Sequence, residues 1–192
     1  KYVIYEHDYK FHKHRNPIKY NNFIVPKQEI INYNFFNNAE RVVCLSKLHH
    51  DIFRDNLGLK NLHNTTCSLW SEEDMSFMES LIGTPKNNKC AIVNSPNPIK
   101  RTKDCVEYCK ENNLEFDLIS SPEYHDFLRL LARYKTFVAL PGHPEPTPRV
   151  IVEAKVLGCE ILSNKTTVGV FYEDWFNLNG AELLQKMREI KK

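Results

Sequence analysis

The chain has 192 residues, of which 42% are hydrophobic and 26% are charged, and its formal net charge at pH 7 is +2. This hydrophobic content is enough to bury a core, which excludes a disordered protein. Lysine and arginine are scattered among the acidic residues and no apolar run approaches the roughly 18 residues of a membrane span, so we expect a soluble, cytoplasmic protein without a nucleic-acid partner.

Short β-branched or aromatic runs alternate with amphipathic stretches along the whole sequence. The expected strands are Tyr2 to Tyr5, Arg41 to Leu45, Thr66 to Leu69, Lys89 to Asn94, Phe116 to Ser120, Thr136 to Leu140 and Glu160 to Ser163. The expected helices are Lys27 to Asn37, Lys47 to Asn56, Lys103 to Asn112, Tyr124 to Tyr134, Pro148 to Leu157 and Ala181 to Ile190. Such alternation is typical of βαβ units, so the predicted class is α/β with parallel sheets.

The alternation is interrupted between Ser71 and Asn88, where Ser71 to Asp74 could cap a short helix and Gly83 to Asn88 is polar and turn-forming. We interpret this stretch as a linker. The expected domains are an N-terminal lobe at residues 1–70, a linker at 71–88, a second lobe at 89–178 and a C-terminal helix at 179–192. Each lobe is expected to be Rossmann-like.

Six cysteines occur in the chain, and none of them forms a Cys-x2-Cys pair. Free thiols in a reducing compartment are the simplest interpretation. Cys105 and Cys109 are one helical turn apart and could both bind a metal, but two ligands without partners make a poor site. We therefore expect no metal.

The segment from His143 to Ala154 carries two glutamates, Glu145 and Glu153, across a junction between a loop and a helix. Thr147 is a suitable N-cap, Pro148 suits the first helical position, and Gly158 suits the helix end. Side chains lean toward the helix N-terminus, so both carboxylates are expected at that end. There the N-terminus of the helix would bind a phosphate, while the carboxylates would accept hydrogen bonds from hydroxyl groups of the same ligand. Alternatively, Glu153 is a solvated partner of Arg149 four residues earlier.

The Glu-x7-Glu pattern is followed by Ala154, Gly158 and Ile161-Leu162, and is preceded by the strand Thr136 to Leu140. This arrangement resembles the donor site of retaining glycosyltransferases of the GT-B fold, especially glycosyltransferase family four (group 1). The resemblance implies two Rossmann-like lobes and transfer of a sugar, of the hexosyltransferase type, from a nucleotide-diphosphate sugar to an acceptor hydroxyl with retention. It also implies that Glu145 meets the donor sugar, that Glu153 meets the ribose, and that Pro146, Thr147 and Arg149 belong to the donor site.

A basic loop, Ser95 to Arg101, follows the expected strand Cys90 to Asn94. In the resembled family an arginine and a lysine in this loop meet the donor diphosphate. Lys100 matches the lysine, whereas Ser95 or Pro96 occupies the arginine position. A basic side chain there would stabilise the leaving nucleotide. The alternative is a solvated lysine at the start of a helix.

His7 follows the first expected strand, and the resemblance implies a histidine near the donor sugar at this place. We therefore expect His7 and Glu145 to be the catalytic pair. Ligands of parallel-sheet proteins do bind at the carboxyl ends of strands. Two alternatives are a metal site formed by His7, Asp8, His12 and His14, and a hydrated loop. The sequence contains no Asp-x-Asp motif, so no catalytic metal is expected, and the donor is a substrate rather than a cofactor.

The N-terminal lobe is short by the family's measure and begins directly on a strand, so we expect it to be incomplete. The acceptor, whether glycan, lipid or protein, is not indicated by the sequence. A second copy of the chain or a partner subunit could supply the acceptor side. Two other functions remain open: a non-catalytic nucleotide-binding or glycan-binding module, and a nucleotide-sugar epimerase or phosphorylase, because fold does not fix function.

Overall fold

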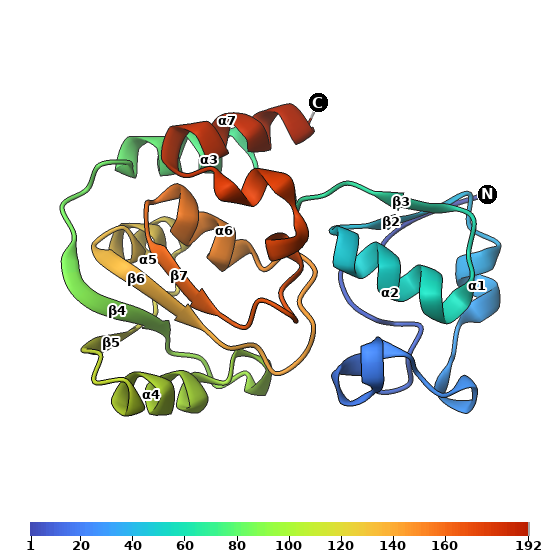
Figure 1. The fold of residues 1–192 in the computed structure, drawn as a ribbon. Coiled ribbons are helices and arrows are strands. Elements are labelled where there is room, and N and C mark those ends of the chain that lie inside the picture. The colour runs from blue at the N-terminus through green and yellow to red at the C-terminus, as the bar shows by residue number, and fades with distance from the viewer. Residues whose placement is uncertain (192) are drawn as a thin grey trace. The chain divides into compact units, whose positions relative to one another are not determined.

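The computed structural model describes residues 1–191, which form two compact units (Figure 1). Unit 1 contains residues 1–68 together with two later segments, 143–148 and 165–174. Unit 2 contains residues 69–142, 149–164 and the C-terminal part from residue 175. The chain therefore passes more than once between the units, whereas the sequence pattern suggests that each lobe is one continuous stretch.

Unit 1 is built on a three-stranded parallel sheet in the order β1-β2-β3. The chain order of its elements is β1 (Val3–Tyr5), α1 (Tyr33–Asn37), β2 (Arg41–Cys44), α2 (Lys47–Leu57) and β3 (Leu62–Asn64). Helix α2 starts at an N-cap, because the Ser46 hydroxyl accepts the N–H of His49 at 3.2 Å. It ends at Gly58, whose φ of 63° is readily adopted only by glycine.

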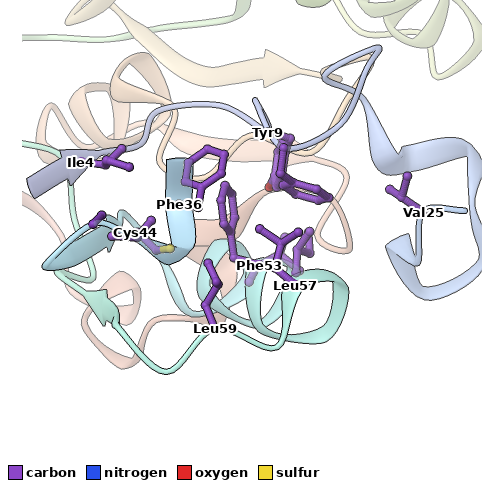
Figure 2. Packing of buried hydrophobic residues seen from close by; sticks show 13 residues of the cluster. Ile4, Tyr9, Val25, Phe36, Cys44, Phe53, Leu57 and Leu59 are labelled. Atoms are coloured by element: carbon purple, nitrogen blue, oxygen red, sulfur yellow. The ribbon is translucent and has the colours of Figure 1, made fainter. Parts of the chain in front are cut away.

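The core of unit 1 lies between the sheet and α2 and is rich in aromatic rings (Figure 2). The rings of Phe11 and Phe36 meet Phe53 edge to face, with centroids 4.8 and 5.3 Å from it. Such ring pairs add stability beyond their buried area. Tyr9 also belongs to this core and is fully buried.

The two later segments of unit 1 contact the carboxyl end of β2 and the start of α2. Glu145 pairs with Val168 in an isolated parallel bridge, and the Thr147 hydroxyl donates to the carbonyl oxygen of Leu45 at 2.7 Å. The Glu173 carboxylate accepts the N–H of Lys47 at 2.6 Å. This N–H belongs to the first turn of α2, which has no intrahelical acceptor for it.

Unit 2 contains a four-stranded parallel sheet in the order β5-β4-β6-β7. Its elements in chain order are α3 (Glu72–Leu81), β4 (Asn87–Val93), α4 (Thr102–Glu111), β5 (Phe116–Ile119), α5 (Tyr124–Leu131), β6 (Tyr134–Ala139), α6 (Arg149–Val156), β7 (Glu160–Ser163) and α7 (Gly180–Lys191). Within unit 2, α4 covers one face of the sheet, while α5 and α6 lie on the other and contact α3 (Figure 1). The expected α/β class with parallel sheets is confirmed.

Three expected elements differ from the structure. Thr66 has a φ of 63°, which no strand accommodates, so the strand expected at Thr66 to Leu69 forms earlier as β3. The helix expected from Lys27 to Asn37 is broken at Asn32, which has a φ of 59°, and only α1 remains α-helical beyond it. Residues 71–88, interpreted as a linker, instead contain α3 and the start of β4.

Helix α3 forms because Ser71 caps it, accepting the N–H of Asp74 at 3.0 Å, and because Met75 and Met78 are fully buried. The helix is thereby part of unit 2. No helix within residues 1–191 has both the length and the apolar content needed to cross a membrane.

Candidate functional site

The strand order of unit 2 creates a natural place for a ligand. From β4 the chain proceeds through α4 to β5 on one side, and from β6 it proceeds through α6 to β7 on the other. The connections that leave the neighbouring strands β4 and β6 therefore diverge, and ligands of open α/β sheets bind at the carboxyl ends of strands at such a switch point.

A pocket of about 390 Å³ lies at this place and lies wholly within unit 2. This volume is within the usual range for small-ligand pockets. Three of its lining residues are sequence-predicted donor-site residues: Lys100, Arg149 and Glu153. The complete lining consists of Val93, Lys100, Tyr124, Phe127, Arg149, Val150 and Glu153.

Glu153 lies in the middle of α6 and is only 3% exposed. Its Oε1 accepts the indole N–H of Trp70 at 2.9 Å and the hydroxyl of Tyr124 at 2.7 Å. The Nε of Arg149 is 3.5 Å from the same oxygen. The alternative interpretation, a solvated partner of Arg149, is therefore wrong, although the contact with Arg149 exists.

Burial raises the pKa of Glu153 above its ordinary value, because removal of water disfavours the charged carboxylate. The hydrogen bonds from Trp70 and Tyr124 act in the opposite direction, and so does the positive charge of Arg149. The negative charge of Asp74 adds to the increase. A buried carboxylate with a perturbed pKa in a pocket is a frequent mark of a functional site.

Arg149 is held by two aromatic rings. Its guanidinium carbon lies 5.2 Å from the centre of the Trp70 ring and 5.5 Å from the centre of the Tyr124 ring. These are cation–π distances, so the rings restrict the guanidinium while leaving its charge in place. Arg149 is also the first residue of α6, where unpaired N–H groups favour an anion.

Lys100 reaches the pocket because the loop after β4 is well ordered by internal hydrogen bonds. The Asn97 side chain accepts the N–H of Ile99 at 3.0 Å, and the Thr102 hydroxyl donates to the carbonyl oxygen of Val93 at 2.8 Å. The carbonyl oxygen of Ile99 accepts the N–H of Gly142 at 3.0 Å, which ties this loop to the turn after β6. Arg101 forms an ion pair with Asp104.

The other expected residues of the donor signature lie in unit 1. Glu145, Pro146 and Thr147 belong to the segment 143–148, whereas Glu153 belongs to unit 2. Helix α6 begins at Arg149, one residue later than expected, and the Thr147 hydroxyl donates to the carbonyl oxygen of Leu45. The helix nevertheless ends as predicted at Gly158, which has a φ of 79°.

His7 is exposed in the turn after β1, in unit 1. The Glu6 carboxylate shapes this turn by accepting the N–H groups of His7 and Asp8 at 3.1 and 2.9 Å. In the alternative metal site, both ring nitrogens of His12 already have partners. Its Nε2 contacts Glu29 at 2.9 Å, and its Nδ1 accepts the N–H of Asn16 at 3.2 Å. Residues 1–191 contain no cluster of three or more His, Cys, Asp or Glu side chains suited to a metal.

Sequence reasoning misses three residues of the pocket region: Trp70, Tyr124 and Phe127. Trp70 falls in the expected N-terminal lobe, next to the expected linker. The helical spacing of Phe127 indicates a core residue, but in the structure Phe127 lines the pocket. A tyrosine at the first position of the helix after β5 is a usable signal, because that position follows the carboxyl end of a parallel strand.

Two solved structures resemble the chain over 98% of its length. The first is Anabaena Alr3699/HepE in complex with UDP, with a TM-score of 0.51 and 17% identity. The second is a mutant of S. aureus TarM in complex with fondaparinux, alpha-GlcNAc-glycerol and UDP, with a TM-score of 0.56 and 13% identity. The chain has the GT-B fold.

The GT-B likeness extends over only part of each neighbour, since the chain spans 61% of the first and 46% of the second. No model of a known protein family matches the sequence, and no curated protein does. At these identities the two structures show the fold and leave the chemistry to be argued from the residues.

Proposed function

We propose that the chain is the donor-binding part of a glycosyltransferase that uses a nucleotide-diphosphate sugar. The observation that carries the proposal is the pocket at the β4/β6 switch point, where Lys100, Arg149 and Glu153 line one space. Two cations suit a diphosphate, and a buried carboxylate suits the hydroxyl groups of a ribose. UDP is the first ligand to test, because both structural neighbours are complexes with UDP.

In this mechanism the nucleotide diphosphate is the leaving group. Lys100 and the N–H groups at the start of α6 offset the negative charge that develops on it as the bond to the sugar breaks. Glu153 orients the nucleotide, and we assign Glu145 and His7 of unit 1 to the sugar, in accordance with the family resemblance. Retention of configuration, membership in family four and independence of a metal are parts of the same proposal.

A non-catalytic nucleotide-binding or glycan-binding module is the second candidate, because a shared fold does not fix function. In either case we place the protein in a reducing compartment such as the cytoplasm, because its cysteines are free thiols and all are buried.

Calorimetry with UDP and with UDP-sugars tests the proposal. Binding of UDP that is weakened in Glu153→Gln but kept in Glu160→Gln supports the pocket, since Glu160 is an exposed glutamate of the same unit. Hydrolysis or transfer of the bound sugar then favours an enzyme over a binding module. Equal UDP affinity in both variants, or absence of UDP binding, would reject the proposed pocket.

A further inference from the structure

The carboxylate of Glu153 is presented to the pocket in an asymmetric way. Within residues 1–191, each hydrogen bond and ion pair of this group ends on Oε1. The other oxygen, Oε2, has no partner among these residues and is not one of their buried unpartnered atoms, so it is the oxygen that a ligand can reach. An asymmetric carboxylate of this kind needs donors in fixed places, because rotation about the last side-chain bond would exchange the two oxygens.

The two donors lie far from α6 in the sequence, 83 and 29 positions before Glu153. Trp70 precedes α3 and is 4% exposed, and Tyr124 is the first residue of α5. Trp70 does not line the pocket, whereas Tyr124 does. The indole N–H of Trp70 can only donate a hydrogen bond. It therefore occupies Oε1 of Glu153 without accepting hydrogen bonds from the hydroxyl groups of a ligand.

We infer that Trp70 and Tyr124 are positioning residues that hold the Glu153 carboxylate by Oε1 and thereby present Oε2 to the hydroxyl groups of the bound nucleotide. The inference rests on the proposed function for the nature of the ligand, but the arrangement of the three side chains does not depend on it. Arg149 completes the arrangement, because the same two rings that serve Glu153 also hold its guanidinium.

The same donors favour the charged form of the carboxylate. The groups that act on Glu153 are Arg149 on its own helix, Trp70 and Tyr124 as donors, and Asp74 on α3. Lys100 lines the same pocket. Burial and Asp74 raise the pKa of Glu153, and the two donors lower it, so loss of either donor moves the pKa upward. As the pH falls, a ligand that needs the charged carboxylate should then dissociate at a higher pH than it does from the wild-type protein.

The first test uses the free protein, so it does not depend on any ligand. The indole N–H resonance of Trp70 is followed by nitrogen-edited NMR from pH 4 to pH 8, with Trp175 as the internal reference and Trp70→Phe for assignment. We expect a titration of Trp70 with a midpoint above 4.5, its disappearance in Glu153→Gln, and a higher midpoint in Tyr124→Phe. A titration that persists in Glu153→Gln, or the absence of one in the wild-type protein, would overturn the inference.

The second test measures UDP affinity over the same pH range. Trp70→Phe retains an aromatic ring beneath Arg149 but removes the N–H together with part of the ring system, whereas Tyr124→Phe removes only the hydroxyl. We expect each variant to bind UDP about tenfold more weakly than the wild type at pH 8. As the pH is lowered, each variant should lose its remaining UDP affinity at a higher pH than the wild type does. Glu153→Gln should bind weakly without this pH dependence. Unchanged affinity and an unchanged pH profile in both phenylalanine variants, with thermal unfolding showing that they are folded, would refute the positioning role.

The two tests separate failure of the inference from failure of the proposed function. If the free protein shows the expected NMR titration but binds no UDP, the arrangement around Glu153 is right and the proposed ligand is wrong. If UDP binds but Trp70 does not follow the titration of Glu153, the proposed function stands and the positioning role is wrong.

Discussion

The hydroxyl of Thr147 donates to the carbonyl oxygen of Leu45 at 2.7 Å, although the two residues are 102 positions apart in the chain. Helix α6 begins only two residues after Thr147 but belongs to unit 2. The Glu-x7-Glu segment thus has its first glutamate in unit 1 and its second in unit 2. Under the proposed function the two carboxylates have separate tasks, and their positions in different units make these tasks separable by mutation.

Replacement of Lys100 by alanine is expected to weaken the binding of UDP about tenfold while leaving uridine binding unchanged. The lysine charge would act on the diphosphate, and a charged hydrogen bond contributes about 1.5 to 3 kcal/mol. Calorimetry with both ligands measures the difference. Lys103→Ala is the matched control, because Lys103 is exposed on α4. An equal loss for uridine and UDP would contradict a diphosphate contact.

Glu145→Ala is expected to preserve the affinity for UDP and to remove any additional affinity of a UDP-sugar over UDP. The reason is that Glu145 lies in unit 1, whereas the proposed nucleotide pocket lies in unit 2. Competition experiments that compare UDP with each UDP-sugar, in the wild type and in the variant, measure this difference. Loss of UDP affinity itself would show that Glu145 contributes to nucleotide binding instead.

Gly169→Ala is expected to destabilise the protein by about 1 to 3 kcal/mol, the usual cost of forcing extra volume into a packed site. A Cβ at this position would collide with the carbonyl oxygen of Pro146 and with the Ser46 side chain. Gly142→Ala is the comparison, because its Cβ would meet the flexible Arg101 side chain at 2.9 Å. Chemical unfolding of the two variants should place Gly169→Ala well below Gly142→Ala in stability; the reverse order would be unexpected.

The stability of the fold should depend on the protonation of Glu153. Its pKa in the folded protein is raised above the ordinary value of 4.5, so folding favours the protonated form. The corresponding stability is present below pH 4.5 and is lost as the pH rises through the folded pKa. Glu153→Gln has no such group, so it should gain stability relative to the wild type over this pH range. Unfolding curves of both proteins at several pH values measure the difference in their free energies of unfolding. This difference should increase as the pH rises from 4.5, and a constant difference would contradict the raised pKa.

Local sequence signals predicted the parts of the site that depend on neighbouring residues. The helix that carries Glu153 and its end at Gly158 follow from capping and backbone preferences, and the structure agrees with both. One boundary differs, because α6 begins at Arg149 rather than at the expected Pro148. The bond from the Thr147 hydroxyl to Leu45 is a tertiary contact, which a local capping signal does not predict.

The surroundings of Glu153 could not be predicted in this way. Its donors Trp70 and Tyr124 are 83 and 29 positions distant, and no periodicity or spacing connects them with α6. They meet because α3 packs against both α5 and α6 in unit 2. The roles of Glu145, His7, Pro146 and Thr147 in binding a donor likewise stay predictions, since they depend on a ligand.

The division of the chain among three stretches has a consequence for how unit 1 is made. During synthesis, β1, β2 and β3 emerge about a hundred residues before the strand partner of Glu145 at Val168 and the acceptor of the Lys47 N–H at Glu173. Domains generally fold as units once their residues are available. Unit 1 therefore completes only after most of unit 2 has left the ribosome, and a fragment cut at Ser68 should open the start of α2 to proteases.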